Sequence, residues 1–187
     1  MYSRDFGKLN ILARGSNKIV SKLAGHIEPC VLSSLMIAQG SGWDILAQAR
    51  TIKSFKTIRL DQRRFLLVSL CVECLDQLTR AEERDQEVFD LLLIVLNRIE
   101  RMEFKEEGEE LNFIYHYLLH LLIHLGFAPD MRHQEILNTP LVADILEDDI
   151  IISNEAKAVI ERYLAHALDG RELFLFNANY IAKLLNC

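Results

Sequence analysis

Apolar and polar residues alternate in two parts of the first sixty residues, which is the pattern of half-buried β-strands. The alternation runs through residues 8–14 and again through residues 43–50. Between them, residues 30–38 are apolar almost without interruption, which predicts a strand buried on both faces. Gln39–Gly42 supplies a glycine-rich turn, so the segments on either side of it are predicted to form a β-hairpin.

From about residue 60 the apolar residues recur at spacings of three and four, which is typical of amphipathic helices. One stripe runs from Leu67 to Leu78, through Cys71 and Cys74. Residues 85–101 are apolar on nearly every side, which predicts a helix at the centre of a bundle. Residues 103–110 read as a charged linker.

The second half of the chain continues the helical pattern. A third long helix is predicted over residues 111–125, ended by Gly126 and Pro129. A fourth is predicted after Ser153 or Asn154, either of which can cap it, and it ends at Gly170. A last helix is predicted over residues 173–184. The sequence thus predicts an α+β fold in which a small β-module precedes a bundle of five or six helices.

Composition narrows the class of protein. The chain has 187 residues, half of them hydrophobic and 26% charged, which fits one globular domain or two small ones. No apolar run is long enough to cross a membrane, and the first residues lack a signal-peptide core. Four cysteines without a secretion signal indicate a reducing cytoplasm. The sequence contains neither a phosphate-binding glycine loop nor a nucleophile elbow, so we predict that the protein is not an enzyme.

Charge is distributed unevenly along the chain. Residues 1–60 hold nine Lys or Arg and three acids, a net charge of +6, whereas the other 127 residues hold 12 basic and 24 acidic residues, a net charge of −12. This asymmetry predicts a basic surface for a polyanion. The acidic part needs no explanation beyond solubility.

The basic residues form two groups that could hold a sugar–phosphate backbone by counterion release. Arg14, Lys18 and Lys22 lie in a turn-rich loop. The second group recurs every third residue and comprises Arg50, Lys53, Lys56 and Arg59, with Arg63 and Arg64 beside it. We add Lys8 on charge alone, and expect the groups to form one continuous electropositive face.

Two aromatic residues lie near these cations. Trp43 and Phe55 could stack on nucleic-acid bases. The alternative is that they belong to the core, which is more usual for a lone Trp at the start of an alternating strand.

Two further clusters have a chemical and a structural interpretation. Cys71 and Cys74 form a C-x-x-C pair, but they fall on an apolar helix stripe, and core packing is favoured. His116, His120 and His124 recur every fourth residue, roughly opposite the main apolar stripe of their helix. That spacing lets two imidazoles chelate a metal, while a polar helix face is the simpler interpretation. The sequence leaves open whether these histidines bind a metal.

Several motifs, in order, resemble the bacterial recombination mediator RecO. They are the glycine–lysine segment at Gly7–Leu9, the basic turn at Ala13–Ser16, the run Ser21–Pro29, the glycine hairpin at Gly40–Gly42, and Leu125–Asp130 at a helix end. An acidic hinge before Phe89 also matches. The resemblance covers most of residues 6–130.

This resemblance implies an N-terminal OB-fold followed by a helical domain. We therefore expect a partial OB-like β-barrel over residues 1–58, acting as a nucleic-acid-binding module, and an all-α helical bundle over residues 59–187. By position, Arg14, Lys18 and Lys22 would line the DNA-binding loop. The implied partners are single- and double-stranded DNA, RecR, the C-terminal tail of the single-stranded DNA-binding protein SSB and, indirectly, RecA. The implied location is the bacterial cytoplasm, at the nucleoid.

The sequence departs from the family pattern in two places. Only six residues precede Gly7, where family members have another strand pair, so we expect an in-frame upstream extension that encodes an apolar strand. A misassigned start, a fragment or a degraded module would each explain the difference. Many family members also carry a four-cysteine zinc site after the position of Asp130. Here no cysteine follows before Cys187, so we predict no zinc and no cofactor.

The function predicted from the sequence is DNA repair and homologous recombination. In that role the protein would bind and anneal DNA strands and, with RecR, assist RecA loading onto SSB-coated single strands. The alternative is a helical interaction adaptor whose incomplete β-module has lost DNA binding.

Overall fold

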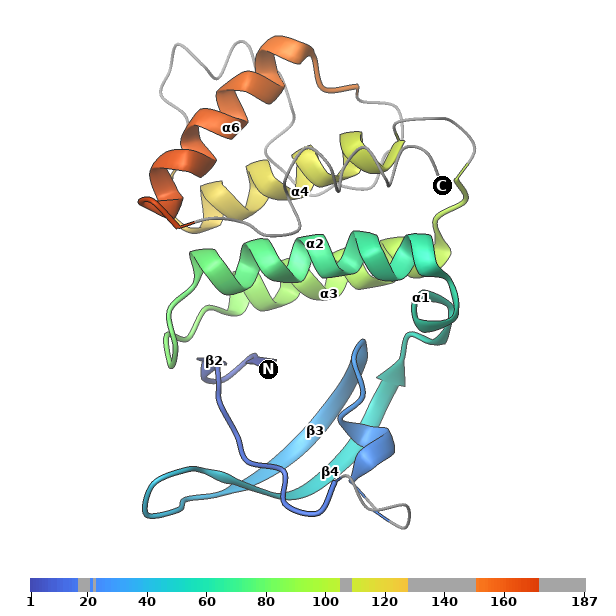
Figure 1. Cartoon of the computed structure of the whole chain (residues 1–187), viewed down its shortest axis with the longest axis vertical. Coiled ribbons are helices and arrows are strands. Elements are labelled where there is room, and N and C mark those ends of the chain that lie inside the picture. Colours follow the sequence, from blue (N-terminus) through green and yellow to red (C-terminus); the bar gives the residue numbers. More distant parts are fainter. Residues whose placement is uncertain (17–20, 22, 105–108, 128–150, 172–187) are drawn as a thin grey trace.

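The computed structural model describes residues 1–16, 21, 23–104, 109–127 and 151–171. Strands occupy the N-terminal part and helices follow, so the predicted α+β class is confirmed. Figure 1 shows the strands β3 and β4 at one end of the molecule, α1, α2 and α3 in the middle, and α4 and α6 at the other end. The predicted boundary between residues 58 and 59 falls inside the short helix α1, Lys56–Leu60.

The main β-structure is the predicted hairpin. β3 (Val31–Ala38) pairs antiparallel with β4 (Ile45–Ser54), and irregularities after Leu32 and Met36 shift the register. The prediction of a strand buried on both faces is wrong, because alternate residues of β3 are exposed. A nearly continuous apolar run does not show whether other elements cover both faces of the strand. In the described residues, β4 is the only strand that pairs with β3.

The predicted strand over residues 8–14 is also largely wrong. Only Gly7–Lys8 forms a strand, β2, which pairs with β1 (Tyr2–Ser3). Leu12 makes an isolated parallel bridge to Ile45. The alternating segment of residues 8–14 therefore forms no continuous strand. It pairs first with the connection after α2, at Lys8, and then with the start of β4, at Leu12. A short 3-10 helix, η1 (Ala24–His26), precedes the hairpin.

The helices begin where local capping signals lie. α2 (Gln62–Leu78), α3 (Gln86–Arg101) and α6 (Asn154–Leu168) each start after a residue whose side chain accepts a backbone N–H of the first turn. These caps are Asp61, Asp85 and Ser153. α4 (Glu109–His124) is followed by Gly126 at a φ of 84°, and α6 by Gly170 at 82°. Both glycines adopt the left-handed conformation that commonly ends a helix. The last predicted helix lies outside the described residues.

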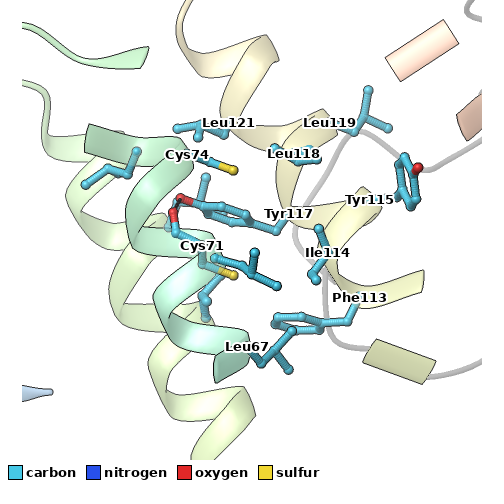
Figure 2. Packing of buried hydrophobic residues seen from close by; sticks show 14 of the residues in the cluster. Leu67, Cys71, Cys74, Phe113, Ile114, Tyr115, Tyr117, Leu118, Leu119 and Leu121 are labelled. Carbon is cyan, nitrogen blue, oxygen red and sulfur yellow. Dashed lines mark hydrogen bonds between the residues drawn. The ribbon is translucent and has the colours of Figure 1, made fainter. Parts of the chain in front are cut away.

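The core lies between helices α2 and α4 and extends to α3 and α6. The predicted stripe from Leu67 to Leu78 is buried, and Figure 2 shows Leu67, Cys71 and Cys74 of α2 facing α4. The Tyr117 hydroxyl crosses this interface and donates to the carbonyl oxygen of Cys71 at 2.8 Å. Burial of an aromatic body with a satisfied hydroxyl is the usual way in which a core accepts tyrosine.

Two helical predictions need correction. α4 buries ten of its residues, whereas α3, expected at the centre, buries four and exposes Ile94. The expected charged linker over residues 103–110 is wrong at its end, because Glu110 lies inside α4 and is 1% exposed. An ion pair with Arg63 of α2 accounts for that burial. In the described residues, no helix is both long and apolar enough to span a membrane.

The N-terminal strands β1 and β2 attach to the helical part. Lys8 bridges Ala81 in the connection between α2 and α3, and the Glu82 N–H donates to the Lys8 carbonyl at 2.9 Å. Gly7 has a φ of 65°, and a Cβ there would lie 1.9 Å from the carbonyl oxygen of Glu83. Glycine is therefore required at this contact on both steric and conformational grounds.

Candidate nucleic-acid interface

Several cations of the N-terminal part hold it against the helices. The Arg4 guanidinium lies 2.7 Å from the Asp90 carboxylate of α3. The Lys8 ammonium lies 3.2 Å from the Asp76 carboxylate of α2 and donates to the Asp76 carbonyl oxygen at 2.6 Å. Their positive charge is therefore already partnered within the protein, which reduces what they offer to a phosphate.

Members of the second predicted group are also engaged. Lys53 donates to the side chain of Asn97 on α3, and its ammonium lies 4.8 Å from the centre of the buried Phe55 ring. Arg59 pairs with Glu28 and donates to the Ser54 hydroxyl. These contacts join the hairpin and the loop before it to α1 and α3.

Arg63 and Arg64 are partly buried and contact the helices rather than contributing to a basic face. Arg63 pairs with the buried Glu110, and its guanidinium lies 4.4 Å from the Phe104 ring centre. Arg64 donates to the carbonyl oxygens of Ile99 and Met102, both at 2.7 Å, at the end of α3. A cation beside the last carbonyls of a helix is favoured by the helix dipole.

Three predicted site residues remain exposed: Arg14, Arg50 and Lys56. Within the described residues, none of the three takes part in an ion pair. Arg50 lies on β4 opposite Ser34, and Lys56 is the first residue of α1. Arg14 follows the segment that runs along β4 at Leu12. Lys18 and Lys22 lie outside the described residues.

The expected continuous electropositive face is therefore divided. One set of cations faces the protein's own helices, and a smaller set, Arg14, Arg50 and Lys56, faces solvent. The sequence could not separate the two sets, because Arg4 and Lys8 meet carbonyl or carboxylate partners 86 and 68 residues away along the chain.

The two aromatic candidates have opposite environments. Phe55 is fully buried, so its stacking interpretation is wrong. Trp43 is 64% exposed at the turn of the hairpin, so for this residue the core interpretation is wrong.

The thiol and imidazole clusters show no metal site among the described residues. Cys71 and Cys74 are buried as core residues, and burial raises the pKa of the Cys74 thiol to about 12, which disfavours the thiolate that metal binding and redox chemistry need. His120 lies in the core, contrary to expectation. Burial, followed by the charges of His116 and His124, lowers its pKa to about 4, so it is neutral at pH 7.

Comparison with known proteins adds a family match. The model for the N-terminal part of recombination protein O matches residues 1–55, and the model for its C-terminal part matches residues 59–145. DNA repair protein RecO of Roseiflexus sp. (strain RS-1) is 31% identical over 126 residues, which cover 67% of this chain and 42% of the relative.

Two other relatives match this chain with similar identity and coverage. DNA repair protein RecO of Trichodesmium erythraeum (strain IMS101) is 31% identical over 132 residues, covering 68% of this chain and 46% of the relative. The protein of the same name from Nostoc sp. (strain PCC 7120 / SAG 25.82 / UTEX 2576) is 28% identical over 130 residues, covering 70% and 44%. The matched part of this chain thus spans about half the length of these curated relatives.

Proposed function

This chain belongs to the RecO family of DNA repair proteins, and we propose that it is a non-enzymatic recombination mediator that binds single- and double-stranded DNA. In this proposal it anneals complementary strands and, together with RecR, helps RecA replace SSB on single strands. Its place of action would be the bacterial nucleoid. RecR and the C-terminal tail of SSB are the proposed protein partners.

One observation carries the DNA-binding part of the proposal. Arg14, Arg50 and Lys56 are exposed, and in the part of the chain that the structure describes they have no acidic partner. Each cation that replaces a counterion on a single strand contributes about −0.7 to the slope of log K against log salt. Three such contacts give a slope of about −2.

A second candidate function is the helical interaction adaptor. The observation that favours it is the use of Arg4, Lys8, Lys53 and Arg59 in contacts between the N-terminal part and the helices. In the adaptor, these cations would have only a structural purpose, and the protein would bind no nucleic acid.

Fluorescence anisotropy of labelled single strands, measured from low to high salt, separates the two functions. We expect the wild-type protein to bind with the slope given above. The variant in which Arg14, Arg50 and Lys56 are all changed to Glu should lose most of its affinity, because three attractive charges become repulsive. The matched control changes Arg80, Arg84 and Arg162, which are exposed on the helical part, to Glu.

The control makes the same change in net charge, so it tests whether position matters. The mediator predicts a loss of affinity in the first variant that is at least about tenfold larger than in the control. If both variants bind as the wild type does, or if the wild type does not bind at all, the DNA-binding proposal is overturned and the adaptor is favoured.

A further inference from the structure

The turn of the hairpin presents an indole ring to solvent. Trp43 is 64% exposed, and it is the only tryptophan in the sequence. The turn is tight, because a Cβ at Gly40 would lie 2.1 Å from the carbonyl oxygen of Trp43. Glycine is therefore required at position 40, where the chain passes close to the backbone of the residue that carries the indole.

The strands of the hairpin expose apolar side chains together with a cation. In the strand register, Met36 lies opposite Gln48 and Ser34 opposite Arg50. Ile52, at the irregularity after Leu32, is exposed like Arg50, whereas Thr51 between them is partly buried. Met36 is 60% and Ile52 65% exposed, so these side chains are open to solvent in the described structure.

The segment that leads to a second cation, Arg14, runs along the edge of β4 that faces away from β3. The Leu12 N–H donates to the Asp44 carbonyl at 2.8 Å, and the Leu46 N–H donates to the Leu12 carbonyl at 3.0 Å. These bonds place the chain of Leu12–Arg14 alongside the start of β4. Leu12 pairs with Ile45, two residues after Trp43, so the segment that leads to Arg14 lies beside the start of β4 near the turn.

The charge of the hairpin indicates which class of ligand would bind to it. Residues 31–54 contain one acid, Asp44, and two cations, Arg50 and Lys53. An exposed aromatic ring on a hairpin that also exposes cations suits an unpaired base that stacks while its phosphates are held by guanidinium groups. The bases of a duplex are already stacked on one another, so a duplex offers the indole no comparable surface.

From this arrangement we infer that Trp43 is a base-stacking residue that makes the hairpin prefer single-stranded over double-stranded nucleic acid. The inference rests on the proposed function, since it names the strand form that the same basic hairpin selects. Arg14 and Arg50 supply the attraction common to both strand forms, and Trp43 supplies the discrimination.

Because the chain has a single tryptophan, its own fluorescence reports on this contact. The 187-residue chain is titrated with an unlabelled oligothymidylate of about 20 nucleotides and with a mixed-sequence duplex of equal length. We expect the oligothymidylate to quench the Trp43 emission on binding. The duplex should leave the emission nearly unchanged.

Substitutions then test the discrimination by anisotropy with labelled forms of the same two probes. Trp43→Ala should weaken single-strand binding about tenfold and duplex binding less than about twofold. Trp43→Phe retains a stacking ring and should restore most of the lost affinity. Ile151→Ala removes an 84% exposed apolar side chain from the helical part and serves as the control, with no expected change for either probe.

Each other outcome has a defined meaning. If both probes bind but the emission does not change, or if Trp43→Ala weakens the two probes equally or not at all, the stacking role is overturned while the proposed function stands. If the wild-type protein binds neither probe, the proposed function fails together with the inference.

Discussion

The hairpin and the helices differ in what their side chains contact. Every residue of the α2 stripe from Leu67 to Leu78 is buried, and α4 packs against it with ten buried residues. In the hairpin strands only Leu46 and Ala49 are buried, while Met36 and Ile52 are exposed. Burial of apolar surface is the main source of stability, so the helical part is the scaffold and the hairpin is the part with surface left for a ligand.

The same contrast holds for arginine residues that look alike in the sequence. Arg50 on β4 faces solvent, whereas Arg63 on α2 neutralises the buried carboxylate of Glu110. Both belong to the basic stretch that predicts a DNA-binding surface. In the structure, Arg50 remains available to a ligand, whereas Arg63 is partly buried and holds a core carboxyl group.

The largest effect that we expect is the difference in stability between two single variants, one in which Arg63 and one in which Arg50 is replaced by alanine. Arg63→Ala leaves the buried Glu110 side chain without its ion-pair partner, which should lower the free energy of unfolding by about 3–5 kcal/mol. Arg50→Ala removes an exposed side chain and should change it by less than about 0.5 kcal/mol. Urea unfolding followed by circular dichroism measures both values. Equal effects would contradict the division between scaffold and surface.

Acidification should weaken the helical part before the hairpin. The pKa of His120 is lowered to about 4 in the folded protein, against about 6.5 when unfolded, so protonation favours the unfolded state. The stabilising contribution is full above pH 6.5 and falls as the pH drops toward 4, by about 3 kcal/mol in total. His120→Gln should flatten this part of the pH profile.

Thermal melts between pH 7 and pH 4 measure this effect, with helical circular dichroism and Trp43 emission as separate probes. A pH profile that is identical in the wild type and in His120→Gln would rule out the buried histidine as the cause.

Sequence periodicity predicts the helices well because their signals are local. The stripe from Leu67 to Leu78, the Ser153 cap and the Gly126 end each depend on residues within a few positions of one another. The hairpin turn is likewise predictable from Gly40 and Gly42, which lie within it. In these elements, local conformational preference and the tertiary structure agree.

The candidate site is less predictable because it depends on distant partners. Whether Lys8 faces a ligand or Asp76 is decided by a contact across 68 residues, and the role of Arg63 is decided by Glu110 on another helix. The apolar composition of a strand also does not show whether other elements cover it. β3 is largely apolar, yet alternate residues along it are exposed. The charge pattern thus identifies the basic region, while three-dimensional contacts select Arg14, Arg50 and Lys56 within it.

The smallest of these effects concerns the junction between the two regions. The Glu100 carboxylate of α3 accepts the backbone N–H groups of Thr57 at 3.2 Å and Ile58 at 3.1 Å, at the start of α1 directly after the hairpin. Glu100→Ala leaves these two donors without their acceptor and should cost about 1–2 kcal/mol.

Amide hydrogen exchange locates this loss at the junction. We expect the Thr57 and Ile58 amides to exchange about tenfold faster in Glu100→Ala, because about 1.4 kcal/mol corresponds to a tenfold change in local opening. Glu87→Ala on the same helix is the control, since Glu87 is exposed and contacts only His124 among its described partners. Unchanged exchange at Thr57 and Ile58 would show that other contacts, such as those of Lys53, Arg59 and Phe55, hold the hairpin to the helices without this cap.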